Sequence, residues 1–270
     1  MLPEKAELAM RTRRLFRADF LLIALLSMGL IGCAASGAAP TPPTLAYDRA
    51  AQIVASTDRS AADRTNDIRR HPTELLAFIG IRPGWTALDV STGGGYTAEL
   101  LARAIGPSGT VYAQSQRNTT ADVLAGREKN MQAAGVAAAK LVYVGQRLEN
   151  PVPPEAADGK LDLVTLMFNY HDFGSMGVDR SALNRAVFRA LKPGGIYVVA
   201  DHAGRPGTGI SESNTLHRIE QSFLRGEVEA AGFKLAGEGT FLRNPNDPRD
   251  KETPEPAQPK DEFVLKFVKP

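Results

Sequence analysis

One short stretch constrains the fold of this chain more than any other. An apolar run, Thr86–Val90, leads through Ser91-Thr92 into three consecutive glycines, Gly93–Gly95, and a helical pattern begins at Tyr96. Glycine lets the backbone turn with positive φ and lets a ligand approach the main chain closely. The free N–H groups at the start of the following helix then face that ligand. The stretch therefore predicts a strand, a tight turn and a helix, with a candidate binding site at the turn.

Strands and helices alternate on either side of this turn. Further strands are predicted at 110–114, 141–144, 161–168, 196–200, 233–242 and 262–268, and the main helices at 47–55, 72–79, 96–105, 121–134, 179–191 and 216–231. This alternation indicates an α/β fold with a mostly parallel sheet covered on both faces. The last two strands are joined by a polar, proline-rich loop without a helix, which favours an antiparallel end strand. We predict one doubly wound domain over residues 47–270.

The first 33 residues have the pattern of an export signal. A basic region, Arg11–Arg17, precedes an apolar segment, Phe20–Ile31, that is too short to span a bilayer comfortably. The segment ends at Gly32-Cys33, which holds the only cysteine of the chain and resembles a bacterial lipoprotein signal. We expect residues 1–33 to be a lipoprotein-type signal peptide, a membrane anchor through lipidated Cys33, and a flexible tether over residues 34–46. The alternatives are a cleaved signal peptide whose cysteine is incidental, or an uncleaved anchor helix.

Details around this segment refine the expected localisation. Met10 directly precedes the basic cluster, so translation can also begin there, and Arg13-Arg14 resembles a twin-arginine export signal. Ala34 follows the cysteine where an aspartate would favour retention in the inner membrane. We therefore expect the periplasmic face of the outer membrane, reached by the twin-arginine or the general export route.

The charge of the chain argues against nucleic acid as a partner. The first 32 residues hold five basic and three acidic groups, so the remaining 27 basic and 27 acidic residues balance. A nucleic-acid-binding domain carries a basic excess. The hydrophobic content of 43% is ordinary for a globular protein. We expect a monomer that binds a small molecule or a component of the cell envelope.

Four motifs in a fixed order resemble class I S-adenosylmethionine-dependent methyltransferases. They are the turn Asp89–Gly95, the sequence Asn169-Tyr170-His171-Asp172 after the fourth strand, the turn Lys192–Gly195, and Glu229–Phe233 before the sixth strand. The resemblance covers about residues 72–268 and implies a Rossmann-like seven-stranded sheet in the order 3-2-1-4-5-7-6. Together with Asp201-His202 and Leu216–Ile219, the second motif is also similar to a group of exported methyltransferases of unassigned substrate.

The resemblance implies S-adenosylmethionine as the cofactor. Its amino-acid end would lie against Asp89 and the backbone of Gly93–Gly95, and the crevice outside strands one, two and four would hold the rest. The other cofactor-binding candidates are Ser91, Tyr96, Gln114 and Asn169.

This chain departs from the family pattern at three places. Ser91 stands where the first glycine of the turn is usual, and Gln114 replaces the acidic residue that accepts the ribose hydroxyls. The aspartate often found after strand three is absent from Gly145-Gln146-Arg147. A glutamine oxygen can accept a hydroxyl, but the bond lacks the strength that charge adds.

Candidate catalytic groups follow strands four and five, whose carboxyl ends are neighbours in this fold. We predict that His171 is a general base or substrate contact and that Asp172 orients it. Weaker candidates for substrate contacts are Tyr170, Asp201, His202 and His217. The same side chains can form a two-histidine, one-carboxylate metal site. Because no tight ligand spacing supports that alternative, we predict no metal.

We conclude that the sequence predicts an exported, lipid-anchored methyltransferase. S-adenosylmethionine is made in the cytoplasm, so a non-catalytic binding lipoprotein with the same fold is the main alternative. A nicotinamide-dependent oxidoreductase is disfavoured because the turn does not follow G-x-G-x-x-G. The charged segment Asp58–Arg70 is interpreted as a solvated face, with a lid over the ligand site as the alternative.

Overall fold

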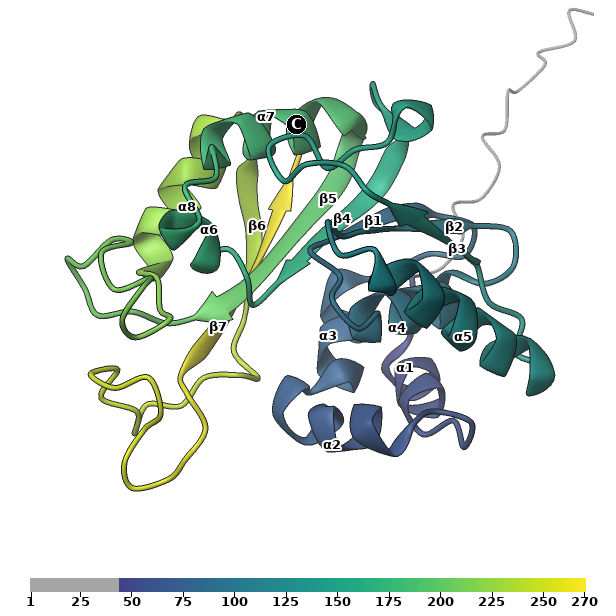
Figure 1. The fold of residues 1–270 in the computed structure, drawn as a ribbon, viewed down its shortest axis with the longest axis horizontal. Helices are drawn as coiled ribbons and strands as arrows, with labels where there is room; N and C mark the ends of the chain where they lie inside the picture. Colours follow the sequence, from purple (N-terminus) through teal and green to yellow (C-terminus); the bar gives the residue numbers. More distant parts are fainter. Residues whose placement is uncertain (1–43) are drawn as a thin grey trace, which may run out of the picture. The chain divides into compact units, whose positions relative to one another are not determined.

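A computed structural model describes residues 44–270, which contain a seven-stranded sheet (Figure 1). The strand order is β3-β2-β1-β4-β5-β7-β6. The strands are β1 Thr86–Val90, β2 Thr110–Gln114, β3 Lys140–Val144, β4 Leu161–Met167, β5 Leu191–His202, β6 Lys234–Gly239 and β7 Glu262–Val268. The first five are parallel, whereas β7 runs antiparallel to both of its neighbours. The predicted fold class, strand order and antiparallel end strand are confirmed.

Helices cover both faces of this sheet and produce two hydrophobic cores. The helices are α1 Tyr47–Val54, α2 Ala61–Arg70, α3 Pro72–Ile79, α4 Tyr96–Ile105, α5 Thr119–Ala133, the short 3₁₀ turn η1 Pro154–Ala156, α6 Asp172–Ser175, α7 Arg180–Ala190 and α8 Gln221–Ala230. The blue and teal helices α1 to α5 lie on one face, and α6 to α8 lie on the other (Figure 1).

The central strand β4 shows how the sequence produces two cores. Leu163 and Met167 pack into the core with α3 and α4, while Val164 and Leu166 pack into the core with α7 and α8. Successive side chains of a strand point to opposite faces, so a nearly continuous apolar run can serve both cores.

The structure differs from the sequence prediction in several elements, among them β6, which ends at Gly239 rather than at 242. The helix expected from Leu216 begins at Gln221, because Ile219 instead pairs with Ala203 in an isolated bridge. Strand β5 begins at Leu191 rather than at 196, since Leu191 pairs with Leu161 across a register shift. Helix α2 was not predicted, although the Ser60 side chain caps it by accepting from the Asp63 N–H.

The predicted signal peptide, with Cys33 and the alternative start at Met10, lies outside the described residues. The same holds for the tether up to residue 43. Between residues 44 and 270, the helices are too short or too polar for any of them to cross a lipid bilayer.

The topology places the candidate site at the carboxyl ends of the parallel strands. The order reverses between β1 and β4, which are hydrogen-bonded neighbours with Asp89 beside Thr165. In doubly wound sheets ligands bind outside the carboxyl ends of the strands at such a reversal. Asp89, Asn169 and Asp201 all lie at or just beyond these carboxyl ends.

Candidate functional site

The turn after β1 has left-handed backbone conformation at three residues. The φ angles of Ser91, Gly93 and Gly95 are 57°, 55° and 75°. Ser91 therefore holds, with a side chain, a conformation that glycine adopts at lower cost. Its N–H donates to Oε1 of Gln114 at 2.9 Å, and the Thr92 N–H donates to the Gln114 carbonyl at 2.8 Å. Ser91 and Gln114, two departures from the family pattern, are thus hydrogen-bonded to each other.

A cavity of about 330 Å³, called cavity A here, opens against this turn. It is lined by Ala62, Asp63, Asn66, Arg70, Asp89, Val90, Ser91, Thr92, Gly93, Gly94, Tyr96, Thr97, Arg127, Met167 and Asn169. A Cβ at Gly94 would meet no atom within 4 Å, so this glycine borders open space. Gly95 does not line the cavity: a Cβ there would lie 3.0 Å from side-chain atoms of Arg127 and Leu124. Gly95 therefore permits helix packing.

Helix α2 forms one wall of cavity A, so the segment Asp58–Arg70 is a solvated face only on its outer side. Asp63 is 3% exposed and pairs with Arg127 at 2.7 Å, and Arg127 also donates to the Gly94 carbonyl at 2.7 Å. Arg59 is 4% exposed and pairs with Asp67 at 2.6 Å. These charges are held by partners in the fold, which makes the segment a fixed part of the site.

Tyr96 is tied to the same wall. Its hydroxyl donates to Oδ1 of Asp67 at 2.6 Å, and burial together with the Asp67 charge raises the pKa of the phenol. The ring lines cavity A, while the guanidinium groups of Arg59 and Arg70 lie over it at 5.8 and 5.6 Å from its centroid. The hydroxyl is thus engaged in the wall, and only the ring is available to a ligand.

Asp89 and Arg70 supply opposite charges to cavity A. Asp89 accepts from Thr165 at 2.7 Å and from Thr92 at 2.5 Å, and burial raises the pKa of its carboxyl to about 6. The Nε of Arg70 is buried without a hydrogen-bond partner among the residues that the structure describes. A ligand with both an ammonium and a carboxylate would satisfy the two groups. The amino-acid end of S-adenosylmethionine has this pair, so the cavity fits it.

A second cavity, called cavity B, of about 170 Å³ adjoins cavity A at Ser91 and Asn169. Its other lining residues are Gln114, Ser115, Gln116, Arg117, Leu148, Asp172, Phe173 and Met176. Gln114 is fully buried, with Oε1 on the Ser91 N–H and Nε2 donating to the Gln146 carbonyl at 2.7 Å. Its amide is committed to the backbone on both sides. Gln114 can therefore offer a ribose hydroxyl only the second lone pair of Oε1.

Beyond cavity B, a buried carboxylate holds His171. Nδ1 of His171 lies 2.6 Å from Oδ1 of Asp201, and the His171 N–H donates to Oδ2 at 2.8 Å. Burial lowers the pKa of the imidazole, but the hydrogen bond and charge of Asp201 outweigh it, so the pKa is raised. Asp201, fully buried, thus orients His171 through Nδ1, a role that the sequence prediction had given to Asp172. Asp172 instead faces the other nitrogen, with Oδ1 3.1 Å from Nε2.

The remaining candidates divide between the site and the core. His202 and His217 lie beside His171, with ring centroids 5.3 and 5.7 Å from it. The structure contradicts a substrate contact at Tyr170, which is fully buried and donates to Glu227 at 2.9 Å in the layer of α7 and α8. The positive φ of 61° at Phe168 belongs to the sharp exit from β4. Asn169 faces both cavities, which fits its predicted place in the site.

Sequence reasoning missed the charged residues that build the α2 wall. Asp63, Asp67 and Arg70 are spaced by four and three residues, which places them on one face of a helix. That spacing was the available signal. Arg127, the partner of Asp63, comes from α5, and no local pattern connects it with α2.

Comparison with known proteins gives one matching family. Residues 67–212 match the sequence profile of the ubiE/COQ5 methyltransferase family. The chain is 30% identical over 142 residues to a demethylmenaquinone methyltransferase of Geobacillus kaustophilus (strain HTA426), and 33% identical over 142 residues to one of Staphylococcus aureus (strain JH9). The alignments cover 50% of this chain and 56% and 53% of those proteins. The chain thus spans about half the length of the curated relatives it matches.

Solved structures show the same fold at low sequence identity. The crystal structure of a SAM dependent methyltransferase from Aquifex aeolicus superposes with a TM-score of 0.52 and 16% identity. The match covers 78% of this chain and 100% of that one. At this identity the likeness concerns the fold alone, and it agrees with the strand order found here.

Proposed function

The chain belongs to the ubiE/COQ5 methyltransferase family, and we propose that it methylates a small acceptor that carries an acidic hydroxyl group. S-adenosylmethionine is the cofactor expected from the family and from the fold. When bound, it supplies a methyl group on a positively charged sulfur that is already a good leaving group. The chain must then align the acceptor and remove its proton.

The proposal rests on a series of polar groups that connects cavities A and B with the histidine cluster. Asn169 lines both cavities, and its Nδ2 donates to Oδ2 of Asp172 at 3.3 Å. From Asp172 the polar groups continue to Nε2 of His171 and through Nδ1 to Asp201. In this proposal His171, reached by way of Asp172, accepts the proton of the acceptor, and Asp201 stabilises the charged imidazole.

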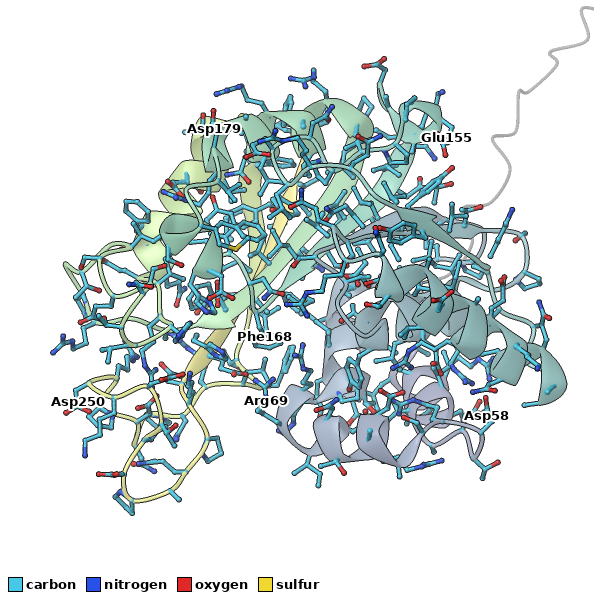
Figure 2. All side chains as sticks on the ribbon, in the orientation of Figure 1. Asp58, Arg69, Glu155, Phe168, Asp179 and Asp250 are labelled. Carbon is cyan, nitrogen blue, oxygen red and sulfur yellow. The ribbon has the colours of Figure 1, made fainter. Side chains whose placement is uncertain are left out.

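A third cavity, called cavity C, of about 440 Å³, supports an acidic acceptor. Arg69 lines this cavity, whereas the adjacent Arg70 lines cavity A, and both guanidinium groups stack on Phe168 at 5.0 and 4.5 Å. Figure 2 shows Arg69 and Phe168 next to each other at the centre of the molecule. The lining also includes Phe241, Lys260 and Glu262, and because Glu262 pairs with Arg69 at 2.6 Å, Lys260 carries the charge that complements an acidic acceptor. Cations beside an aromatic ring favour an anionic or ionisable ring compound.

The names of the curated relatives agree with such an acceptor. They are demethylmenaquinone methyltransferases, and the reduced form of a quinone carries acidic ring hydroxyls. Because the chain spans about half the length of those proteins, their acceptor is carried over only as a chemical class.

Methyl transfer from labelled S-adenosylmethionine to a naphthohydroquinone tests this proposal on the full chain purified in detergent. The variant His171→Gln should lower kcat by about 100-fold or more, because it removes the proton acceptor. Its affinity for S-adenosylmethionine should not change. A folded wild-type protein that binds the cofactor but methylates no acidic acceptor would favour the non-catalytic binding lipoprotein. An unchanged kcat in the variant would reject the role of His171.

We further propose that the protein is exported and anchored through lipid on Cys33, at the periplasmic face of the outer membrane. The support is the signal pattern of residues 1–33. Labelled fatty acid should no longer be incorporated when Cys33→Ser is expressed, and an unchanged lipid content would refute the anchor. Replacing Arg13 and Arg14 by Lys should block secretion if folded protein is exported with its cofactor already bound, and secretion should persist if the general route is used.

A further inference from the structure

Three potential metal ligands meet beside cavity B. Nε2 of His171 and Nδ1 of His217 each lie 3.1 Å from Oδ1 of Asp172. One ligand atom from each of the three side chains can be chosen so that all three lie within 4.8 Å of one another. His171 and Asp172 follow β4, whereas His217 precedes α8, so the fold and not the sequence spacing creates the group.

The separations suit coordination of a transition metal. Zinc binds histidine nitrogen and carboxylate oxygen at about 2.0–2.2 Å. Two ligands at such distances are about 3.0 Å apart at a right angle and about 3.4 Å apart at a tetrahedral angle. The two separations of 3.1 Å fall in this interval. The side chains therefore need little rearrangement to enclose an ion.

Asp201 gives His171 the orientation of a metal ligand. Metal-binding histidines usually donate the N–H of the second ring nitrogen to a carboxylate, which fixes the tautomer. His171 has this arrangement, with Nδ1 2.6 Å from the buried carboxylate of Asp201. When Nδ1 carries the proton, Nε2 presents a lone pair toward the oxygen of Asp172 at 3.1 Å. Two lone pairs repel each other, and a cation between them removes that repulsion.

The accessibility of the three groups favours a small ion. The side chain of His171 is 4% exposed, whereas those of Asp172 and His217 are 30% and 43% exposed. An ion can reach Nε2 between the two exposed ligands, while a larger molecule meets them first. His217 also has a φ of 50°, a strained conformation for a residue with a side chain, and such strain gathers at functional sites.

We propose that His171, Asp172 and His217 bind a divalent first-row transition metal ion. Two imidazoles and one carboxylate suit Zn²⁺ and Fe²⁺ and leave coordination positions open. The sequence predicted no metal, and the spatial grouping is the reason to revise that expectation. Binding of the ion does not depend on the proposed methyl transfer. One consequence does rest on that function: an acceptor oxygen in an open position would be acidified by the ion, and His171 would then act as a ligand instead of a proton acceptor.

His71 can serve as a matched control for His217. His71 and His217 both have positive φ, 44° and 50°, and their side chains are 44% and 43% exposed. Asparagine tolerates this backbone conformation, so His217→Asn and His71→Asn carry the same structural risk. His71 lies near Glu74 at 3.8 Å and is outside the proposed site. A surface histidine that binds metal without specificity would behave like His71.

Calorimetric titration of the chelator-treated full chain with Zn²⁺ tests the proposal, with visible absorption of the Co²⁺ form as the second readout. Wild type and His71→Asn should bind one ion with equal affinity, and His217→Asn should bind at least about tenfold more weakly. Asp201→Asn should lower the affinity by about 10–100-fold, as loss of a residue that orients a metal ligand does. Its Co²⁺ spectrum should change as well, since the geometry of His171 changes.

Two results would overturn the metal site. One is absence of stoichiometric Zn²⁺ binding by folded wild-type protein, and the other is equal binding by wild type and His217→Asn. Titration of the same samples with S-adenosylmethionine separates this proposal from the proposed function. Cofactor binding without metal binding would reject the metal site alone, and metal binding without cofactor binding would reject methyl transfer alone.

Discussion

The two ends of the candidate cofactor crevice differ in how their polar groups are used. In cavity A the Asp89 carboxylate and the Arg70 guanidinium keep capacity for a charged ligand, and Gly94 borders open space. In cavity B the amide of Gln114 already contacts the Ser91 N–H and the Gln146 carbonyl. Charge-based recognition is therefore concentrated at the amino-acid end. At the nucleoside end Gln114 replaces the acid of the family pattern, and its contact with Ser91 holds the turn.

The wall of cavity A also differs from the surroundings of cavity B in the charges that it buries. Asp63 and Glu99 are 3% and 5% exposed and share Arg127 as a partner. Buried charges are stable only while they remain paired, so this end of the crevice is sensitive to loss of one residue.

Replacing Arg127 by Ala should destabilise the chain most. The change leaves Asp63 without its 2.7 Å partner and removes the donor to the Gly94 carbonyl. Breaking a buried pair in this way costs about 3–5 kcal/mol in the free energy of unfolding. Urea denaturation checks this, and Arg147→Ala, at a side chain that is 80% exposed, should leave the midpoint unchanged. Equal midpoints for both variants would show that the ion pairs of Arg127 do not contribute to the free energy of unfolding.

Replacing Gln114 by Glu tests the nucleoside end. Glutamate restores the acid that the family uses, but here it would turn an acceptor toward the Gln146 carbonyl, which Nε2 of Gln114 now contacts at 2.7 Å. We expect a loss of about 1–3 kcal/mol in stability, because a buried group loses its partner. Affinity for S-adenosylmethionine, measured by calorimetry, should not improve. Tighter binding by the variant would mean that residue 114 faces the ribose after all.

Replacing Asp89 by Asn should lower the affinity for S-adenosylmethionine and raise the stability of the ligand-free protein at pH 7. A charged hydrogen bond to the cofactor ammonium is lost, so affinity should fall by about tenfold or more. Burial raises the pKa of Asp89 from 3.8 to about 6, so the folded state binds this proton more tightly than the unfolded state. The favourable contribution of that proton is present at low pH and is lost as pH rises from about 4 through about 6. Without ligand, the variant should therefore be the more stable protein at pH 7.

Denaturation of both proteins between pH 4 and pH 8 checks the sign of this effect. The stability difference between variant and wild type should grow up to about pH 6, where the folded-state pKa lies, and then level off. A difference that is constant with pH would show that Asp89 has an ordinary pKa.

Replacing Ser91 by Gly should have the smallest effect. The φ of 57° costs a residue with a side chain about 1–2 kcal/mol, and part of the relief is offset because glycine is more flexible in the unfolded chain. We expect a gain of at most about 1 kcal/mol with unchanged cofactor affinity. Thermal unfolding and calorimetry measure the two quantities. Weaker cofactor binding by this variant would assign a direct contact to the Ser91 hydroxyl.

Much of the sheet was predictable because its signals are local. Thr86–Val90 and Tyr96–Ile105 were placed correctly, since an apolar run, glycines and a helical pattern succeed one another without ambiguity. The strand order was confirmed, but it came from the family resemblance, because no local pattern specifies which strands pair. A Cβ at Gly204 would lie 2.9 Å from the backbone of Ile219, a close approach between the two ends of a loop that no local pattern in the sequence predicts.

Sequence reasoning named several residues that the structure brings close together, but it did not identify which of them contact one another. His171 and Asp201 were both candidates, but their separation by 30 positions hid the contact that makes Asp201 the orienting residue. Tyr170 was misplaced because the direction of a side chain after a strand depends on the sharp bend at Phe168. Arg127 was missed because it reaches Asp63 across 64 positions from another helix.

Calorimetric titration of the full chain with S-adenosylmethionine and S-adenosylhomocysteine measures whether cavity A binds the amino-acid end of the cofactor. Gly94 and Gly126 both lack a positive φ and have no atom within 4 Å of an added Cβ, but Gly126 lies in α5, away from cavity A. We predict that wild type and Gly126→Asp bind with the same Kd. Gly94→Asp should bind at least about 100-fold more weakly, because its carboxylate meets that of the cofactor. Equal binding by all three proteins, or no binding by folded wild type at near-millimolar ligand, would contradict the account.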